Sequence, residues 1–160
     1  MKQTPDAQRV QENLRAGILT RDGFMGDDPR AFTDVIREDA EALEAVGVTP
    51  EALADRMAEF TRAGLKAAGV PVAFEGYEVV VEDYMGRIGC PFRDHRAPKR
   101  NTTATEPKER ETMSWTDLSI HLIRRHGFFQ GRGSPFRLEP AELARFLKLT
   151  PQKRERPEPR

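Results

Sequence analysis

Hydrophobic positions recur at helical spacing through most of the first 70 residues, in the segments 6–19, 28–47 and 49–69. The second and third segments begin with a capping side chain followed by proline, at Asp28–Pro29 and Thr49–Pro50, and each ends at a glycine. The turn between them is only about three residues long, so we expect the two helices to pack as an antiparallel hairpin. The three hydrophobic stripes are Val10, Leu14 and Ile18; Phe32, Val35, Ile36, Leu43 and Val46; and Leu53, Met57, Phe60 and Gly64.

The pattern changes at Pro71, where β-branched and aromatic residues become frequent. Gly76 indicates a turn, and Tyr77–Tyr84 is the clearest strand. A polar loop is expected over 93–100, followed by two threonine-rich strands within 101–115 that meet at a turn near 106–109. These segments predict a small antiparallel meander.

A further helix is predicted over 115–126, with Ser114 and Asp117 as a capping box and Gly127 as its end. A short helix over 139–148 follows, and 151–160 has the composition of a disordered tail. The predicted fold class is α+β: an N-terminal helical hairpin packed on the β-meander, followed by a helix that carries histidines. We expect the helical segment 1–70 and the segment 71–150 to form one compact unit.

Composition narrows the class of protein further. The chain is 38% hydrophobic and 32% charged, which is typical of a soluble globular protein. No apolar run reaches the roughly 20 residues that span a bilayer, and the first residues lack the apolar core of a secretory signal. One cysteine excludes an internal disulfide. Together these features predict a cytoplasmic protein with no membrane partner.

The net charge of zero conceals a segregation of charge, with −7 over residues 26–60 and +8 over 84–160. Most of this charge is interpreted as solvated surface. Nucleic acid is the alternative partner, because arginines alternate with aromatic residues in the segment 124–137. The near-neutral overall charge and the lack of a recognised nucleic-acid motif weigh against it. The arginines concerned are Arg124, Arg125, Arg132 and Arg137.

Metal binding is the chemistry that the sequence favours most. Cys90, His95, His121 and His126 are all of the thiol and imidazole groups of the chain, and they lie within 37 residues. Cys-x4-His falls where a strand meets a loop, and His-x4-His falls on a helix. Zinc takes thiolate and imidazole in tetrahedral sets, often with one ligand pair on a turn and the other on a helix. We therefore predict a zinc site of these four residues.

The two histidines of the predicted site can reach one ion only under a geometric condition. Five helical residues place two side chains roughly 140° apart, so His121 and His126 are expected to converge only if the last helical turn loosens, which Gly127 permits. The fourth ligand also has alternatives, namely Asp94 or water in place of His95. A simpler interpretation needs no metal: histidines bordering an apolar helix face and a small buried cysteine.

Two catalytic patterns have less support in the sequence than the metal site has. A nucleophilic dyad of Cys90 with His121 or His126, oriented by Asp117 or Asp94, lacks any feature that activates the thiol. The segment "GFFQGRGSPFR" lacks the Gly-Lys-Ser/Thr ending of a phosphate-binding loop and follows a helix. Its glycines are interpreted as turn residues.

Three segments, "GFMGDDPRAFTDVIREDAEAL", "GRIGCPF" and "WTDLSIHLIRRHGFFQGRGSPFRLEP", resemble a family of small bacterial proteins described only as cytosolic or uncharacterised. The resemblance covers residues 17–149, and its most specific part is Trp115–Pro140. It implies a cytosolic location and a shared fold, but no activity. Cys90, His121 and His126 fall in these segments, whereas His95 does not.

The leading functional hypothesis is a non-catalytic cytosolic binding or adaptor protein with a structural zinc site and an unknown protein partner. The second is a nucleic-acid or ribonucleoprotein-associated module that uses the four arginines named above. The third is a metal-dependent hydrolase, which requires that only three protein ligands bind the metal and leave one position open.

Overall fold

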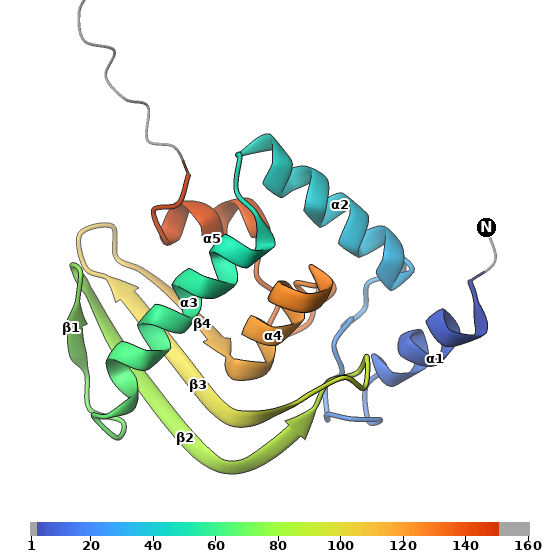
Figure 1. Ribbon diagram of the computed structural model, residues 1–160, viewed down its shortest axis with the longest axis horizontal. Coiled ribbons are helices and arrows are strands. Elements are labelled where there is room, and N and C mark those ends of the chain that lie inside the picture. The colour runs from blue at the N-terminus through green and yellow to red at the C-terminus, as the bar shows by residue number, and fades with distance from the viewer. Residues whose placement is uncertain (1–2, 151–160) are drawn as a thin grey trace, which may run out of the picture.

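A computed structural model describes residues 3–150, and this part of the chain contains five helices and one four-stranded antiparallel sheet of order β1-β2-β3-β4 (Figure 1). The helices are α1 (Pro5–Asn13), α2 (Phe32–Ala45), α3 (Pro50–Leu65), α4 (Asp117–His126) and α5 (Pro140–Phe146). The strands are β1 (Val72–Phe74), β2 (Tyr77–Gly89), β3 (Arg96–Glu106) and β4 (Glu111–Thr116).

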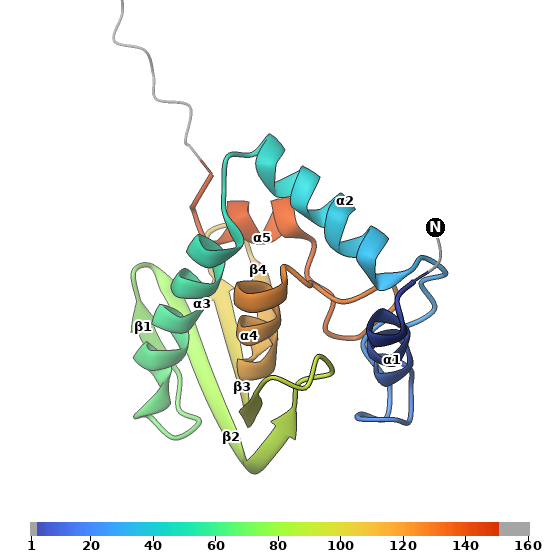
Figure 2. The ribbon, with the colours of Figure 1, turned by 45° about the vertical axis from the view of Figure 1, so that its right-hand side comes forward.

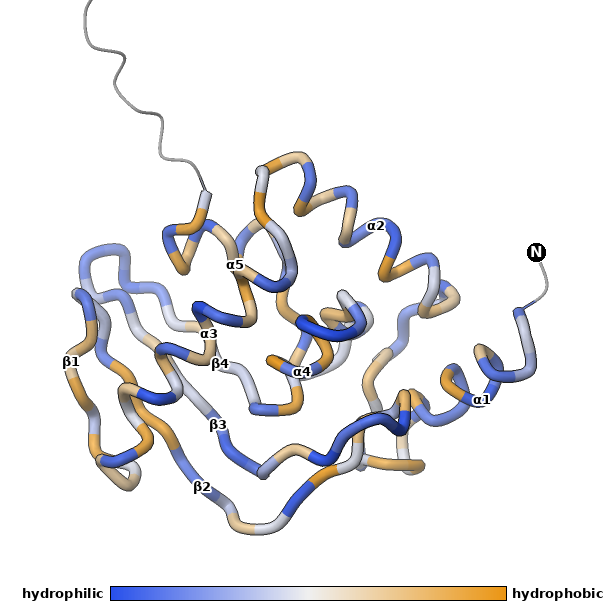
Figure 3. Tube along the Cα trace, in the orientation of Figure 1, coloured by the Kyte–Doolittle hydropathy of each residue, from blue (hydrophilic) through white to orange (hydrophobic). Residues whose placement is uncertain are grey.

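These elements confirm the predicted α+β class, with a helical hairpin, a β-meander and a histidine-bearing helix in the expected order. Hydrophobic and hydrophilic positions alternate along α2 and α3, as their spacing predicted (Figure 3). Within residues 3–150, none of the helices combines the length and the apolar composition that crossing a membrane requires. The predicted tail over 151–160 lies outside the described residues.

The two helices of the hairpin have different neighbours. α3 packs on β2 and against α4, whereas α2 diverges from the turn and packs mainly on α5 (Figures 1 and 2). Gly64 allows α3 to approach the sheet closely, because a Cβ at this position would lie only 2.7 Å from a methyl group of Val81. The sheet is therefore covered by α3 and α4, and α2 forms an outer layer.

α4 lies between two hydrophobic clusters. Ile120 and Ile123 belong to the larger cluster, which α3, α5 and the sheet form around the buried Trp115. Leu118 and Leu122 belong to the second. The other buried members of the second cluster are Leu14, Phe24, Met25, Phe32, Val35, Cys90, Ala97 and Phe128. The helix that carries His121 and His126 is thus held by apolar contacts on both sides.

A bulge in β2 brings the end of the β2–β3 hairpin next to α4. The strand register is interrupted between Asp83 and Arg87, where Met85 and Gly86 have φ values of +55° and +90°. Bulges bend strands and increase their twist. Beyond the bulge, β2 turns, and the loop 90–95 lies beside α1 and α4 (Figure 2).

The structure corrects the predicted loop over 93–100, because β3 begins at Arg96 and includes Pro98. Pro98 pairs with Arg87, directly after the bulge. A proline within a strand lacks an N–H group to donate, and it is tolerated next to such an irregularity. The proline was therefore a misleading sign of a loop.

The predicted start of α2 is also wrong. The helix begins at Phe32 after Ala31, which provides no side-chain cap. Instead, the backbone N–H of Phe32 donates to Gln11 Oε1 of α1 at 2.9 Å. The Asp28 carboxylate accepts from Arg30 Nε at 2.9 Å and from the backbone N–H of Arg132 at 3.0 Å. A side chain distant in sequence thus replaces the expected local cap.

Two other predicted helix ends are displaced. The first helix ends at Asn13 rather than at residue 19, because the Leu14 carbonyl accepts from the backbone N–H of Phe24 as the chain turns back. The capping box of α4 consists of Thr116 and Ser119 rather than Ser114 and Asp117. Ser114 lies in β4.

Candidate metal centre

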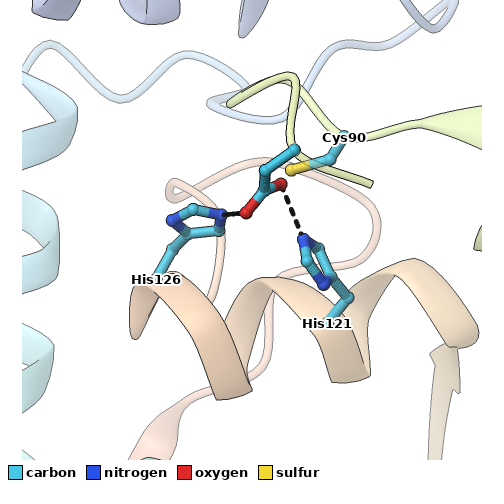
Figure 4. A group of neighbouring side chains, drawn as sticks. Cys90, His121 and His126 are labelled. Atoms are coloured by element: carbon cyan, nitrogen blue, oxygen red, sulfur yellow. Dashed lines mark hydrogen bonds and ion pairs between the residues drawn. The ribbon is translucent and has the colours of Figure 1, made fainter. Parts of the chain in front are cut away.

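Cys90, Asp94, His121 and His126 form a group that can hold a metal ion. One ligand atom from each residue lies within 4.8 Å of all the others. Cys90 is buried, the side chains of His121 and His126 are 13% and 19% exposed, and that of Asp94 is 34% exposed. The sulfur and the two imidazole rings point toward one another, from the loop and from α4 respectively (Figure 4).

The loop that carries Cys90 and Asp94 is closed by its own backbone. The N–H of Cys90 donates to the carbonyl of His95 at 2.8 Å, and the N–H of Arg93 donates to the carbonyl of Cys90 at 2.8 Å. On its outer side, Asn13 Nδ2 of α1 donates to the carbonyl of Pro91 at 3.1 Å. Because these bonds fix the loop at both ends, the thiol and the carboxylate are held near α4 before any metal binds.

Both histidines reach the group from an intact helix. Their Nε2 atoms lie 2.9 Å (His121) and 2.8 Å (His126) from the two carboxylate oxygens of Asp94. α4 stays helical through His126, and Gly127, with φ +59°, caps it through bonds to Ile123 and Leu122. The two rings thus approach a common carboxylate from an intact last turn, and whether that turn loosens around an ion stays a prediction.

Aromatic rings of the loop cover the two imidazoles. Phe92 stacks on His126 with 3.9 Å between ring centroids, and His95 stacks on His121 with 4.4 Å between centroids. Phe92 also meets Phe32 and Phe128 edge to face, which joins it to the second hydrophobic cluster. These contacts restrict rotation of both imidazole rings, which is the requirement for a pre-formed ligand pair.

An ionised carboxylate, that of Asp94, lies between the two imidazole rings. Burial is the main cause that lowers the pKa of His126. Burial also acts to raise the pKa of Asp94, but hydrogen bonds from Cys90 and His121 and the charges of the two histidines outweigh it and hold this pKa well below its usual range. A carboxylate only accepts, so the Nε2 atoms donate to it in the absence of a metal.

The thiol of Cys90 is not activated as a nucleophile. Burial, followed by hydrogen bonding to Asp94, raises the pKa of Cys90 to about 12. The backbone N–H of Phe92, 3.4 Å from Sγ, is the main opposing influence. A thiol with this pKa carries almost no thiolate at neutral pH, so the arrangement does not favour a Cys/His nucleophilic dyad.

We expect Cys90 of the metal-free protein to react with iodoacetamide at pH 8 roughly 100- to 1,000-fold more slowly than an ordinary thiol, because only the thiolate reacts. The rate should keep rising up to at least pH 10. The unfolded chain loses this proton near pH 9.0 and the folded chain near pH 12, so the contribution of the thiol to stability is present below pH 9.0 and is lost as the pH rises toward 12. Mass spectrometry of the alkylated protein measures the rate, and the same protein in urea is the control. A plateau with a midpoint at or below pH 8 would contradict this assignment.

The structure brings together three of the four predicted metal ligands. His95 is exposed and is not a member of the group; it covers the ring of His121 instead. Asp94, an alternative fourth ligand at the sequence level, occupies that place. It lies next to His95 in the chain, and the closed loop turns its carboxylate toward α4 while leaving the neighbouring imidazole on the outside.

The four arginines proposed for nucleic acid are in different environments. Arg124 and Arg125 border a cavity beside the metal centre, and the backbone of Arg132 donates to Asp28. The side chain of Arg137 is only 8% exposed and is paired with Asp39, so it is not available to a nucleic acid. This burial removes Arg137 from the predicted basic surface, and nucleic-acid binding by the others stays a prediction.

Comparison with known protein families, with curated proteins and with solved structures found no match for this chain. The resemblance to small bacterial cytosolic proteins therefore stays a prediction.

Proposed function

We propose that the protein is a non-catalytic cytoplasmic binding protein in which Cys90, Asp94, His121 and His126 hold a structural zinc ion. The observation that carries this proposal is the convergence of one thiol, two imidazoles and one carboxylate within 4.8 Å, supplied by a closed loop and a rigid helix. The ion would connect two segments about 30 residues apart in the sequence, at the border of the second hydrophobic cluster.

The set of donor atoms favours zinc among the common metals. Magnesium and calcium prefer shells composed of oxygen, whereas one sulfur, two imidazole nitrogens and one carboxylate oxygen suit a tetrahedral zinc ion. In such a shell the donor atoms lie about 3.3–3.6 Å apart, so the widest pair of the group must approach by about 1 Å. Rotation of the half-exposed Asp94 side chain supplies part of this movement.

Zinc titration with ligand variants tests the proposal. We expect the wild-type chain to bind one equivalent of zinc, and we expect Cys90→Ala and His126→Asn each to weaken binding by more than about 100-fold, the upper range seen for loss of an outer-shell partner. His95→Asn is the matched control, since it makes the same change in a ring that only stacks. Competition with a chromogenic chelator gives the affinities.

The same series distinguishes between the two candidates for the fourth ligand. Asp94→Asn should weaken binding far more than His95→Asn. The opposite order would replace Asp94 by His95 in the ligand set, and an unchanged affinity in all four variants would reject the site. Affinity should also rise with pH, because zinc must displace the proton of Cys90.

A second candidate function is a metal-dependent hydrolase, which one observation favours: Asp94 and His121 also line a cavity of about 520 Å³. Replacement of zinc by cobalt separates the two functions. Azide changes the visible spectrum of cobalt when it enters an open coordination position, which indicates a catalytic type of site. A spectrum that azide leaves unchanged indicates the closed shell of a structural ion.

A further inference from the structure

A cavity of about 520 Å³ opens between α3, β3 and α4, next to the candidate metal centre. This volume lies within the range of small-molecule sites. One part of its wall is apolar, with Leu65 from α3, Ala97 and Pro98 from β3, and Ile120 from α4. The rest of the wall is polar and charged.

Four arginines and two aspartates line this cavity. Arg124 is paired with Asp55 at 2.8 Å, which leaves its charge largely balanced. Arg100 lies 3.4 Å from the carboxylate of Asp117 and at the same distance from that of Asp83. The remaining two arginines, Arg62 and Arg125, have no ion-pair partner within residues 3–150.

Two buried polar atoms of the cavity wall lack hydrogen-bond partners among the described residues: Arg100 Nε, a donor, and Asp117 Oδ1, an acceptor. Arg100 Nε has an ion-pair contact of 3.4 Å to Asp83 Oδ2, but it makes no hydrogen bond there. Buried polar atoms are nearly always bonded, so two unbonded atoms on residues that line one cavity favour a polar occupant. An occupant that satisfies both atoms must present an acceptor to Arg100 and a donor, such as a hydroxyl group, to Asp117.

We infer that this cavity binds a phosphate monoester of a small hydroxylated molecule, with the phosphate between Arg62, Arg100 and Arg125 and a hydroxyl group on Asp117. A phosphate monoester carries a charge of about −1.5 to −2 at neutral pH, which matches two unpaired arginines better than a singly charged carboxylate does. Guanidinium groups bind phosphate oxygens through paired, charge-assisted hydrogen bonds. None of these four residues belongs to the metal-binding group, although Asp94 and His121 of that group line another part of the same cavity.

Isothermal titration of the full chain with glucose 6-phosphate tests the inference, with glucose and gluconate as comparison ligands. We expect glucose 6-phosphate to bind at least roughly 10-fold more tightly than either comparison ligand, because only the phosphate engages all three arginines. Binding should persist when zinc is removed by a chelator. Equal binding of gluconate would overturn the assignment to phosphate, and equal binding of glucose would overturn the anion site altogether.

Arginine variants test the location of the site. Arg62→Gln and Arg125→Gln remove exposed charges from the cavity rim, and each should weaken binding roughly 10-fold, the usual loss for one charge-assisted hydrogen bond. Arg15→Gln, an exposed arginine that does not line this cavity, should leave the affinity unchanged. If Arg15→Gln weakens binding as much as the cavity variants do, the attraction is a general surface charge effect and the inference fails.

Discussion

Removal of zinc with a chelator is expected to lower the melting temperature of the protein by roughly 10 °C. A ligand that binds only the folded state at a concentration of about 1,000 times its dissociation constant stabilises it by about 4 kcal/mol. For a domain of this size, each 1 kcal/mol changes the melting temperature by about 2–4 °C. The proposed ion would have this effect because it would join the loop 90–95 to α4 more strongly than the hydrogen bonds between Asp94 and the two histidines do.

Differential scanning calorimetry, with and without chelator, measures this effect. Cys90→Ala is the control, because this variant should melt at one temperature under both conditions, close to that of the chelated wild type. Alanine fits the buried apolar environment of Cys90, so the variant should still fold. A wild-type melting temperature that does not change while zinc is lost would show that the ion does not contribute to folding.

Replacement of Asp39 by Asn is expected to cost about 3–5 kcal/mol, because it leaves Arg137 charged and buried without its main partner. The Arg137 guanidinium donates to both carboxylate oxygens of Asp39, at 2.8 and 2.9 Å, and to the carbonyl of Gln130 at 2.7 Å. The two side chains are 8% and 6% exposed. This pair connects α2 to the segment that leads into α5.

Urea unfolding measures the cost, and Glu139→Gln is the matched control. Glu139 contacts the same guanidinium at 3.0 Å but is 50% exposed, so its loss should cost less than about 1 kcal/mol. The double variant Asp39→Leu/Arg137→Met should recover part of the stability, since it leaves no unpaired charge. Equal costs for Asp39→Asn and Glu139→Gln would contradict the assignment of a buried ion pair.

The order of helices and strands was predictable because its signals are local. Thr49 and Pro50 fix the start of α3, and the period of Leu53, Met57 and Phe60 identifies the face that it buries. The threonine-rich hairpin is equally local: Thr105 and Thr112 face each other with their hydroxyl oxygens 3.0 Å apart. Local patterns of this kind survive in the fold because tertiary contacts reinforce them.

The errors arose where a distant residue replaced a local partner. Asp28 looked like the cap of α2 because it precedes Pro29, but its carboxylate binds Arg30 and the backbone of Arg132. The side chain of Gln11, from α1, caps α2 instead. No pattern within a short window of sequence can reveal such a contact. Tertiary bonds of this kind displace helix ends without changing the fold class.

Only part of the candidate site was predictable from the sequence. Cys90, His121 and His126 are rare residues, so their clustering is visible in the sequence. Asp94 is one of 26 acidic residues, and the sequence offered it only as an alternative to His95. Its role depends on the closed turn of the loop, which points Asp94 toward α4 and lays His95 on the ring of His121.

X-ray absorption spectroscopy of the protein loaded with one equivalent of zinc examines the ligand atoms themselves. The four proposed ligands predict one sulfur at about 2.3 Å and three nitrogen or oxygen atoms at about 2.0–2.1 Å from the ion. Cys90→Ala should remove the sulfur signal. A shell composed only of nitrogen and oxygen in the wild-type protein, or a chain that retains no zinc, would contradict a metal centre at Cys90, Asp94, His121 and His126.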